Sequence, residues 1–233
     1  MGLRRLIAVA LGVVLTSCAV QAQSSSSSSK HVKKPAAGSP LDAGALRDGV
    51  YRNAAFGFAC KVPPGWVLRT EEMNAGDDTA EAGQEQSQGN AGGKRDSRVL
   101  LAAFSRPPEA RGEDVNSSIV IAAESAAAYP GLKEAAQYFE PLTEVAKAQG
   151  FTVDEEPYET AIGAKRLVRS DFHKDVGTRV MRQSTLAMLA RGYAVSFTFI
   201  DGTEDGMEEL VEGLSFGAGS SNASSRSDAE GRR

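Results

Sequence analysis

Residues 51–66, which read YRNAAFGFACKVPPGW, decide how the rest of this chain is interpreted. Apolar side chains alternate in the first part of this stretch, at Phe56, Phe58, Cys60 and Val62. This period of two predicts a strand over Tyr51–Val62 with one face buried. The tripeptide Pro63-Pro64-Gly65 then predicts a turn, because proline presets φ and glycine admits positive φ. A strand that ends in such a turn indicates a β-rich domain.

Further runs of β-forming residues follow, and short turn signals such as Gly163 and Arg191-Gly192 separate the later ones. The predicted strands are Trp66–Arg69, Arg98–Ser105, Ser117–Glu124, Phe151–Val153, Ala164–Phe172, Thr178–Ala190 and Tyr193–Ile200. Closely spaced strands of this kind indicate an antiparallel meander.

Two stretches have helical periodicity. Apolar residues form one stripe over Leu132–Gln149, where Pro141 should kink or split the helix and Gly150 should end it. The second helix is predicted from Thr203, a good N-cap, to about Leu214. The predicted fold class is therefore α+β, an antiparallel β-sheet with helices packed on its faces.

Composition divides the chain into segments. Residues 23–48 are rich in Ser, Lys, Ala and Pro without apolar periodicity, and we expect a disordered tether there. One domain is expected over residues 49–216, with a low-complexity insertion at 74–97, followed by a disordered tail at 217–233.

The N-terminus is typical of a bacterial export signal over residues 1–22. Arg4 and Arg5 precede the apolar run Leu6–Leu15, and Leu15-Thr16-Ser17-Cys18 looks like a lipobox, residues 15–18. Lipidation of Cys18 would anchor the chain in a membrane of the cell envelope. Val20-Gln21-Ala22 also fits an ordinary cleavage site, which would release a soluble periplasmic or secreted protein starting at Gln23.

Charge and cysteine content exclude several classes of protein. The formal net charge of −4 disfavours nucleic acid as a partner, because that affinity rests on cations that neutralise phosphates. Besides Cys18 the chain has one cysteine, Cys60, so no disulfide framework is expected. The alternation places Cys60 on the buried face of its strand.

The opening Tyr51–Phe58 followed by Val62-Pro63-Pro64-Gly65-Trp66 resembles PsbP-like domains. The resemblance covers most of residues 49–216 and implies a central antiparallel sheet sandwiched by helices, an α/β/α sandwich. Characterised members of this superfamily assist a photosystem or bind a small GTPase. None of their functional residues can be matched here, so the resemblance implies the fold alone.

A possible ligand cluster lies at Asp171, His173 and Asp175, which alternation places on one strand face. Two carboxylates beside an imidazole can bind a divalent cation or orient a general base. Since no second histidine or cysteine cluster completes a site, a solvated strand face is the simpler interpretation. Gly213-Leu214-Ser215-Phe216-Gly217 matches the nucleophile-elbow pattern, but a predicted helix precedes it and both histidines lie upstream. We therefore assign no catalytic residue, metal site or cofactor.

The sequence favours an exported, membrane-tethered, non-enzymatic binding or accessory domain of the cell envelope. Its expected partners are the membrane, through a lipid anchor at Cys18, and an envelope protein or ligand. One alternative is a metal-dependent or hydrolytic enzyme centred on His173. Another is a structural subunit of a larger envelope assembly.

Overall fold

The computed structural model describes residues 41–75, 97–112 and 114–217. The strands are β1 (Ala45–Arg47), β2 (Val50–Asn53), β3 (Phe58–Lys61), β4 (Val67–Leu68), β5 (Ser97–Phe104), β6 (Ser118–Ser125), β7 (Thr152–Ile162), β8 (Lys165–Val176), β9 (Arg179–Ala190), β10 (Tyr193–Asp201) and β11 (Leu214–Phe216). The helices with defined bounds are the 3-10 helices η1 (Ala126–Ala128) and η2 (Ala135–Tyr138), and the α-helices α3 (Phe139–Ala148) and α4 (Glu204–Glu212).

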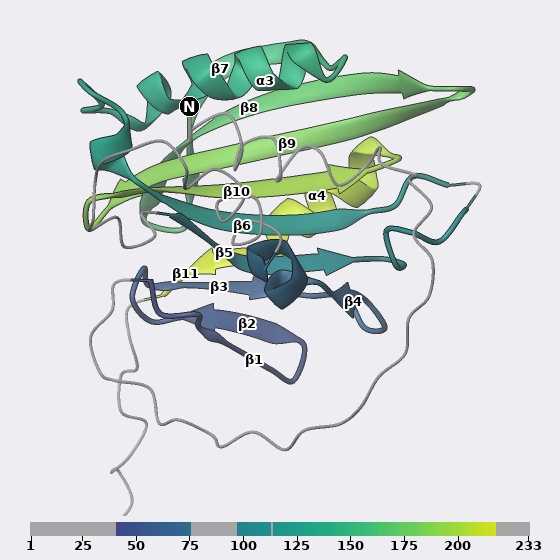
Figure 1. The fold of residues 1–233 in the computed structure, drawn as a ribbon, viewed down its shortest axis with the longest axis horizontal. Helices are drawn as coiled ribbons and strands as arrows, with labels where there is room; N and C mark the ends of the chain where they lie inside the picture. The colour runs from purple at the N-terminus through teal and green to yellow at the C-terminus, as the bar shows by residue number, and fades with distance from the viewer. Residues whose placement is uncertain (1–40, 76–96, 113, 218–233) are drawn as a thin grey trace, which may run out of the picture.

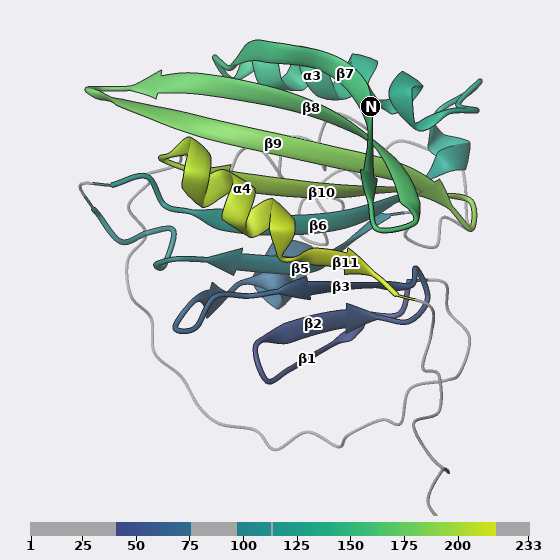
Figure 2. The same ribbon diagram turned by 180° about the vertical axis from the view of Figure 1, so that it is seen from behind.

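Seven strands form one antiparallel sheet in the order β4-β5-β6-β10-β9-β8-β7 (Figure 1). Because side chains alternate along a strand, each face of this sheet packs against different elements. Helix α3 covers one face, where Phe139, Leu142 and Ala146 pack among buried residues of β8, β9 and β10. Helix α4 covers the other face through Leu210 and Val211 (Figure 2). The predicted α+β class, with an antiparallel sheet and helices on its faces, is confirmed.

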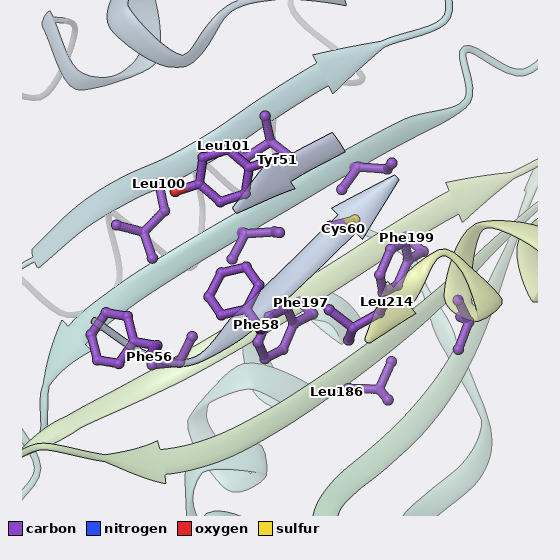
Figure 3. Close-up of a cluster of buried hydrophobic side chains, with 14 of the residues drawn as sticks. Tyr51, Phe56, Phe58, Cys60, Leu100, Leu101, Leu186, Phe197, Phe199 and Leu214 are labelled. Carbon is purple, nitrogen blue, oxygen red and sulfur yellow. The ribbon is translucent and has the colours of Figure 1, made fainter. Parts of the chain in front are cut away.

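The remaining strands form a second, smaller antiparallel sheet in the order β1-β2-β3-β11. Its buried face packs beside α4 on the large sheet and shares one hydrophobic core with it (Figure 3). The ring centroids of Phe58 in β3 and Phe197 in β10 lie 4.9 Å apart, with the ring planes at 86°. Cys60 is fully buried in the same core, as its alternation predicted.

The single strand predicted over Tyr51–Val62 is wrong, because the stretch folds into the hairpin β2–β3. Asn53 makes the turn between the strands. Its backbone carbonyl accepts a hydrogen bond from the Gly57 amide at 2.9 Å, and its side-chain carbonyl accepts one from Phe56 at 3.0 Å. Gly57 has φ of +72°, a conformation that glycine adopts without steric cost.

The folded domain begins before residue 49, since β1 lies within the stretch that composition assigned to the tether. The Tyr51 hydroxyl donates to the Ala43 carbonyl at 2.8 Å, and the Asn53 side-chain amide donates to the backbone carbonyl of Asp42 at 3.0 Å. Gly44, which follows Ala43, has φ of +66°, and a Cβ there would lie 2.6 Å from the Tyr51 hydroxyl. Buried strand side chains therefore hold a segment that has no apolar pattern of its own.

The stretch expected as an insertion, residues 74–97, is ordered at both of its ends. Residues 70–75 are helical, and the Asn74 side chain exchanges two hydrogen bonds with the backbone of Val99 in β5. Ser97 already belongs to β5. Residues 76–96 lie outside the described residues, as do most of the expected tether and tail, the export signal and Cys18.

The helix predicted over Leu132–Gln149 is divided between η2 and α3. Pro141 lies in the first turn of α3, where a helix does not need the missing N–H, so the division precedes it. Gly150 ends the helix with φ of +86°, as predicted. At the C-terminus, Leu214–Phe216 is strand β11 and not the end of a helix, and it pairs with β3. None of the helices in the described ranges is long and apolar enough to cross a membrane.

Candidate functional site

Asp171, His173 and Asp175 lie along β8, as alternation predicted, but each has a different environment. The His173 Nδ1 atom is hydrogen-bonded to the Asp154 carboxylate on the neighbouring strand β7. Arg182 of β9 lies directly opposite His173 in the register. The imidazole is about one third exposed, at 32%, and its contact with Asp154 occupies one ring nitrogen. This pair could orient a histidine for proton transfer, but neither residue lines the cavity between β8 and β9 that is described below.

Asp171 belongs to a separate, more buried network. Arg169 Nε donates to both carboxylate oxygens of Asp171, at 3.0 and 3.1 Å, and the Tyr158 hydroxyl donates to it at 3.0 Å. The two η nitrogens of Arg169 donate to the two carboxylate oxygens of Glu208 in α4. Only 12% of the Arg169 side chain and 14% of the Asp171 side chain are exposed. The network therefore joins β7, β8 and α4.

The charges in this network shift two pKa values. Burial alone would lower the pKa of the Arg169 guanidinium, but its hydrogen bonds and attraction to Glu208 and Asp171 outweigh burial and raise it. Burial, followed by the negative charge of Asp171, raises the pKa of the Tyr158 hydroxyl. Both shifts keep the network in the protonation state that its hydrogen bonds require.

Asp175 is exposed near the end of β8. No group of three or more histidine, cysteine, aspartate or glutamate side chains suited to a metal ion occurs among the described residues. The structure thus places Asp171, His173 and Asp175 on one strand without bringing them together around a common point. Ser215, from the rejected nucleophile-elbow match, lies in β11, and its hydroxyl donates to the Ala59 carbonyl at 3.3 Å.

A second buried polar group lies beneath the helices of the α3 face. The Tyr129 hydroxyl donates to the carboxylate of Glu124, which is only 4% exposed at the end of β6. The rings of Tyr129 and Tyr138 pack edge to face with centroids 5.3 Å apart. Burial, aided by the neighbouring Tyr138 and Glu124, raises the pKa of the Tyr129 hydroxyl. Sequence reasoning missed this group, since its members belong to β6, the residue after η1, and η2.

A wedge-shaped cavity opens where strands β8 and β9 separate. Their pairing stops at Val168 and Ala187, although both strands continue for three more residues. Beyond that point β8 stays paired with β7, and β9 stays paired with β10. The cavity between them has a volume of about 310 Å³. Its apolar lining is formed by Ala135, Ala136, Pro157, Leu167, Val168, Met188 and Leu189, its charged lining by Glu134, Glu159, Lys165 and Arg166, and Tyr158 completes it.

The cavity is a consequence of the chain path and has no sequence motif. The β7–β8 hairpin bends toward the small sheet, where Ile162 packs against the shared core and Gly163 lies near the Phe216 carbonyl. Strand β9 does not follow this bend. Each separated strand segment therefore directs backbone hydrogen-bonding groups toward the wedge.

No protein-family model matches the sequence, and no curated protein matches it. Among solved structures, the chain is similar to cyanobacterial PsbP (CyanoP) from Synechocystis sp. PCC 6803, with 12% identity over 72% of this chain and 91% of that chain, at a TM-score of 0.39. The Ran-binding protein Mog1p of Saccharomyces cerevisiae is 10% identical over 74% of this chain and 96% of its own, also at 0.39. LpqN of Mycobacterium tuberculosis, involved in cell envelope biogenesis, is 12% identical over 52% and 79%, at 0.30. The PsbP-like resemblance noted in the sequence recurs among these structures, and the similarities concern the fold alone.

Proposed function

We propose that this protein is exported and held at a membrane of the cell envelope through a lipid on Cys18, and that its folded domain is a non-enzymatic binding or accessory module. The attachment is supported by the basic residues, apolar run and lipobox-like Leu15–Cys18 of the N-terminal sequence. The observation that favours binding over catalysis is the wedge cavity between β8 and β9. By contrast, Asp171 is already occupied by Arg169 and Tyr158.

The wedge would accept a group with an apolar body and a polar end. Its walls combine aliphatic side chains with charged residues, and the separated strand segments add backbone donors and acceptors. Ligand sites in proteins commonly combine apolar walls with a few polar groups in this way. An extended segment of an envelope protein satisfies these requirements, because its backbone can pair with a strand edge while a side chain fills the cavity.

The first experiment determines the mature N-terminus by intact mass. A lipid-bearing Cys18 supports the membrane attachment, whereas a mature chain that begins at Gln23 contradicts it. Substitution of Cys18→Ala should move the protein from the membrane fraction to the soluble fraction.

The second experiment tests the binding module. Crosslinking in intact cells should recover a reproducible partner for the native chain and lose it for Ala136→Trp, which fills the wedge. Ala54→Trp, at an exposed position in the β2–β3 turn, is the matched control and should retain the partner. Absence of any reproducible partner, or equal loss in both variants, contradicts the proposal.

A second candidate function, an enzyme centred on His173, is favoured by the contact between this imidazole and Asp154. A carboxylate on one ring nitrogen orients the other nitrogen for acid–base work. The test is metal analysis together with His173→Ala. Metal content and hydrolytic activity that do not respond to this substitution would exclude the candidate.

A further inference from the structure

The small sheet has one buried face and one exposed face. Tyr51, Phe58, Cys60 and Leu214 point into the shared core. The alternate residues point outward, and the register places them in two neighbouring rows across the strands. We call this surface the outer face; it consists of Ala45, Arg47, Val50, Arg52, Ala59, Lys61 and Ser215.

The outer face is cationic. Arg47, Arg52 and Lys61 are exposed, and strands β1, β2, β3 and β11 contain no carboxylate. None of these three cations forms an ion pair with another described residue. The nearby acidic residues are Asp48 in the turn between β1 and β2, Asp42 next to Asn53, and Glu212, which precedes the Gly213 that pairs with Lys61. The residues between the cations are small or half-buried, so the charged ends of Arg47, Arg52 and Lys61 are the groups that a flat surface would meet.

Acidic residues are numerous elsewhere in the domain. Helix α4 contains Glu204, Asp205, Glu208, Glu209 and Glu212 and no lysine or arginine. Strand β7 contains Asp154, Glu155, Glu156 and Glu159, all exposed, and no lysine or arginine. Figures 1 and 2 show the part of β7 that lies beside α3 at the opposite end of the molecule from β1 and β2, whereas the last residue of β7, Ile162, packs against the core shared with the small sheet. An anionic surface would therefore attract the outer face and repel the acidic residues of β7 and α4.

The chain also enters the domain at the small sheet. Only the 22 residues 19–40 separate Cys18 from Leu41, and β1 begins four residues after Leu41. Even fully extended, such a segment spans at most about 75 Å. A lipid on Cys18 would thus keep the start of the domain, at the small sheet, within about 75 Å of the bilayer.

We propose that the outer face of the small sheet binds an anionic phospholipid bilayer and so orients the tethered domain, with helix α3 directed away from the membrane. This inference rests on the proposed membrane attachment at Cys18. Each cation near an anionic surface strengthens binding about fivefold, so three cations together contribute on the order of a hundredfold.

The test uses the full chain with Cys18→Ala, which removes the acyl contribution, and measures its partition onto vesicles by sedimentation. One set of vesicles is phosphatidylcholine alone, and the other is phosphatidylcholine and phosphatidylglycerol in equal parts. The triple variant Arg47→Gln, Arg52→Gln, Lys61→Gln should partition on the order of a hundredfold less onto the anionic vesicles. Its partition onto neutral vesicles should not change, and added salt should weaken only the parent chain's extra binding.

The matched control is Lys133→Gln, Lys147→Gln, Arg179→Gln, which removes the same charge from exposed positions outside the small sheet. It should retain the anionic binding, as should the charge-preserving Arg47→Lys, Arg52→Lys variant. Equal loss in both triple variants would mean that only net charge matters, and no loss in either would mean that the face makes no contact. Both results overturn the proposal.

The two proposals fail in distinguishable ways. A lipid on Cys18 with unchanged vesicle binding in the triple variant would leave the attachment standing and reject the outer face. A mature chain that begins at Gln23 would reject the attachment, while the vesicle measurement would still report on the face itself.

Discussion

Arg169 of β8 and Glu208 of α4 form an ion pair through two parallel hydrogen bonds, and this pair joins the large sheet to the helix that covers it. The same guanidinium holds Asp171 through its ε nitrogen. One largely buried cation thus satisfies two carboxylates that are 37 residues apart in the chain.

Loss of Arg169 should destabilise the domain strongly. Arg169→Met leaves the Asp171 carboxylate, 14% exposed, without its cation, and we expect a loss of about 2–3 kcal/mol in the free energy of unfolding. Glu208 is 44% exposed, so Glu208→Gln should lose only about 1 kcal/mol. Urea unfolding of both variants checks the order. Equal losses in the free energy of unfolding would show that the contact between Arg169 and Glu208, and not the burial of Asp171, contributes most to stability.

The contact between Phe58 and Phe197 should carry much of the packing between the two sheets. Both rings are fully or almost fully buried, and Phe58→Ala leaves a cavity that the strands cannot close. We expect a loss of about 3–5 kcal/mol. Phe58→Leu keeps most of the volume and should lose less. Thermal unfolding compares the two variants. Similar melting temperatures would contradict the expectation that the contact between Phe58 and Phe197 carries much of the packing between the sheets.

The thiol of Cys60 should make stability depend on alkaline pH. Burial raises the pKa of Cys60 from 9.0 to about 12. Between these values the folded state keeps the proton that the unfolded state releases, so stability is complete below pH 9 and falls as pH rises toward 12. The contribution is about 1.4 kcal/mol per pH unit.

The comparison uses Cys60→Val, which has no titrating group at this position. The free energy of unfolding, measured in urea between pH 8 and 11, should fall more steeply with pH for the parent chain than for the variant. Parallel curves would contradict the raised pKa. The parent thiol should also resist alkylation at pH 8 until the protein unfolds.

Thr203 should stabilise the start of α4. Its hydroxyl oxygen accepts a hydrogen bond from the Gly206 amide at 3.1 Å, and its own amide donates to Asp201 at 2.9 Å. Thr203→Ala should lower the free energy of unfolding by about 1 kcal/mol, whereas Thr203→Ser keeps the cap. Chemical denaturation of the pair measures the difference, and equal stability of the two variants would show that this cap contributes little.

Much of the fold could be predicted because its signals are local. Runs of β-forming residues between turn signals identified β5, β6, β9 and β10, and the apolar stripes with Thr203 and Gly150 identified both helices. The error at Tyr51–Val62 had a local cause as well. An alternating pattern does not by itself reveal a turn, and here the Asn53 side chain and the positive φ of Gly57 supply one.

The candidate site could be predicted only in part. Alternation correctly placed Asp171 and His173 on one strand. Arg169, which binds Asp171, lies on the same strand, but the partners of His173 and of Arg169 come from elsewhere in the chain. Asp154 lies 19 residues before His173, and Glu208 lies 39 residues after Arg169. Nothing in the spacing of these residues indicates which pairs will meet, because the strand register and the path of α4 decide it.

The sequence by itself determined the α+β class, the burial of Cys60, the start of α4 at Thr203 and the end of α3 at Gly150. These depend on neighbours a few residues apart, whose geometry the backbone dictates. Only the tertiary structure decided that β11 pairs with β3 across 156 residues, that β8 leaves β9 to open a cavity, and that three cations share one exposed face. Such features arise from long-range pairing, in which the packing of the whole core selects one arrangement among many that are locally equivalent.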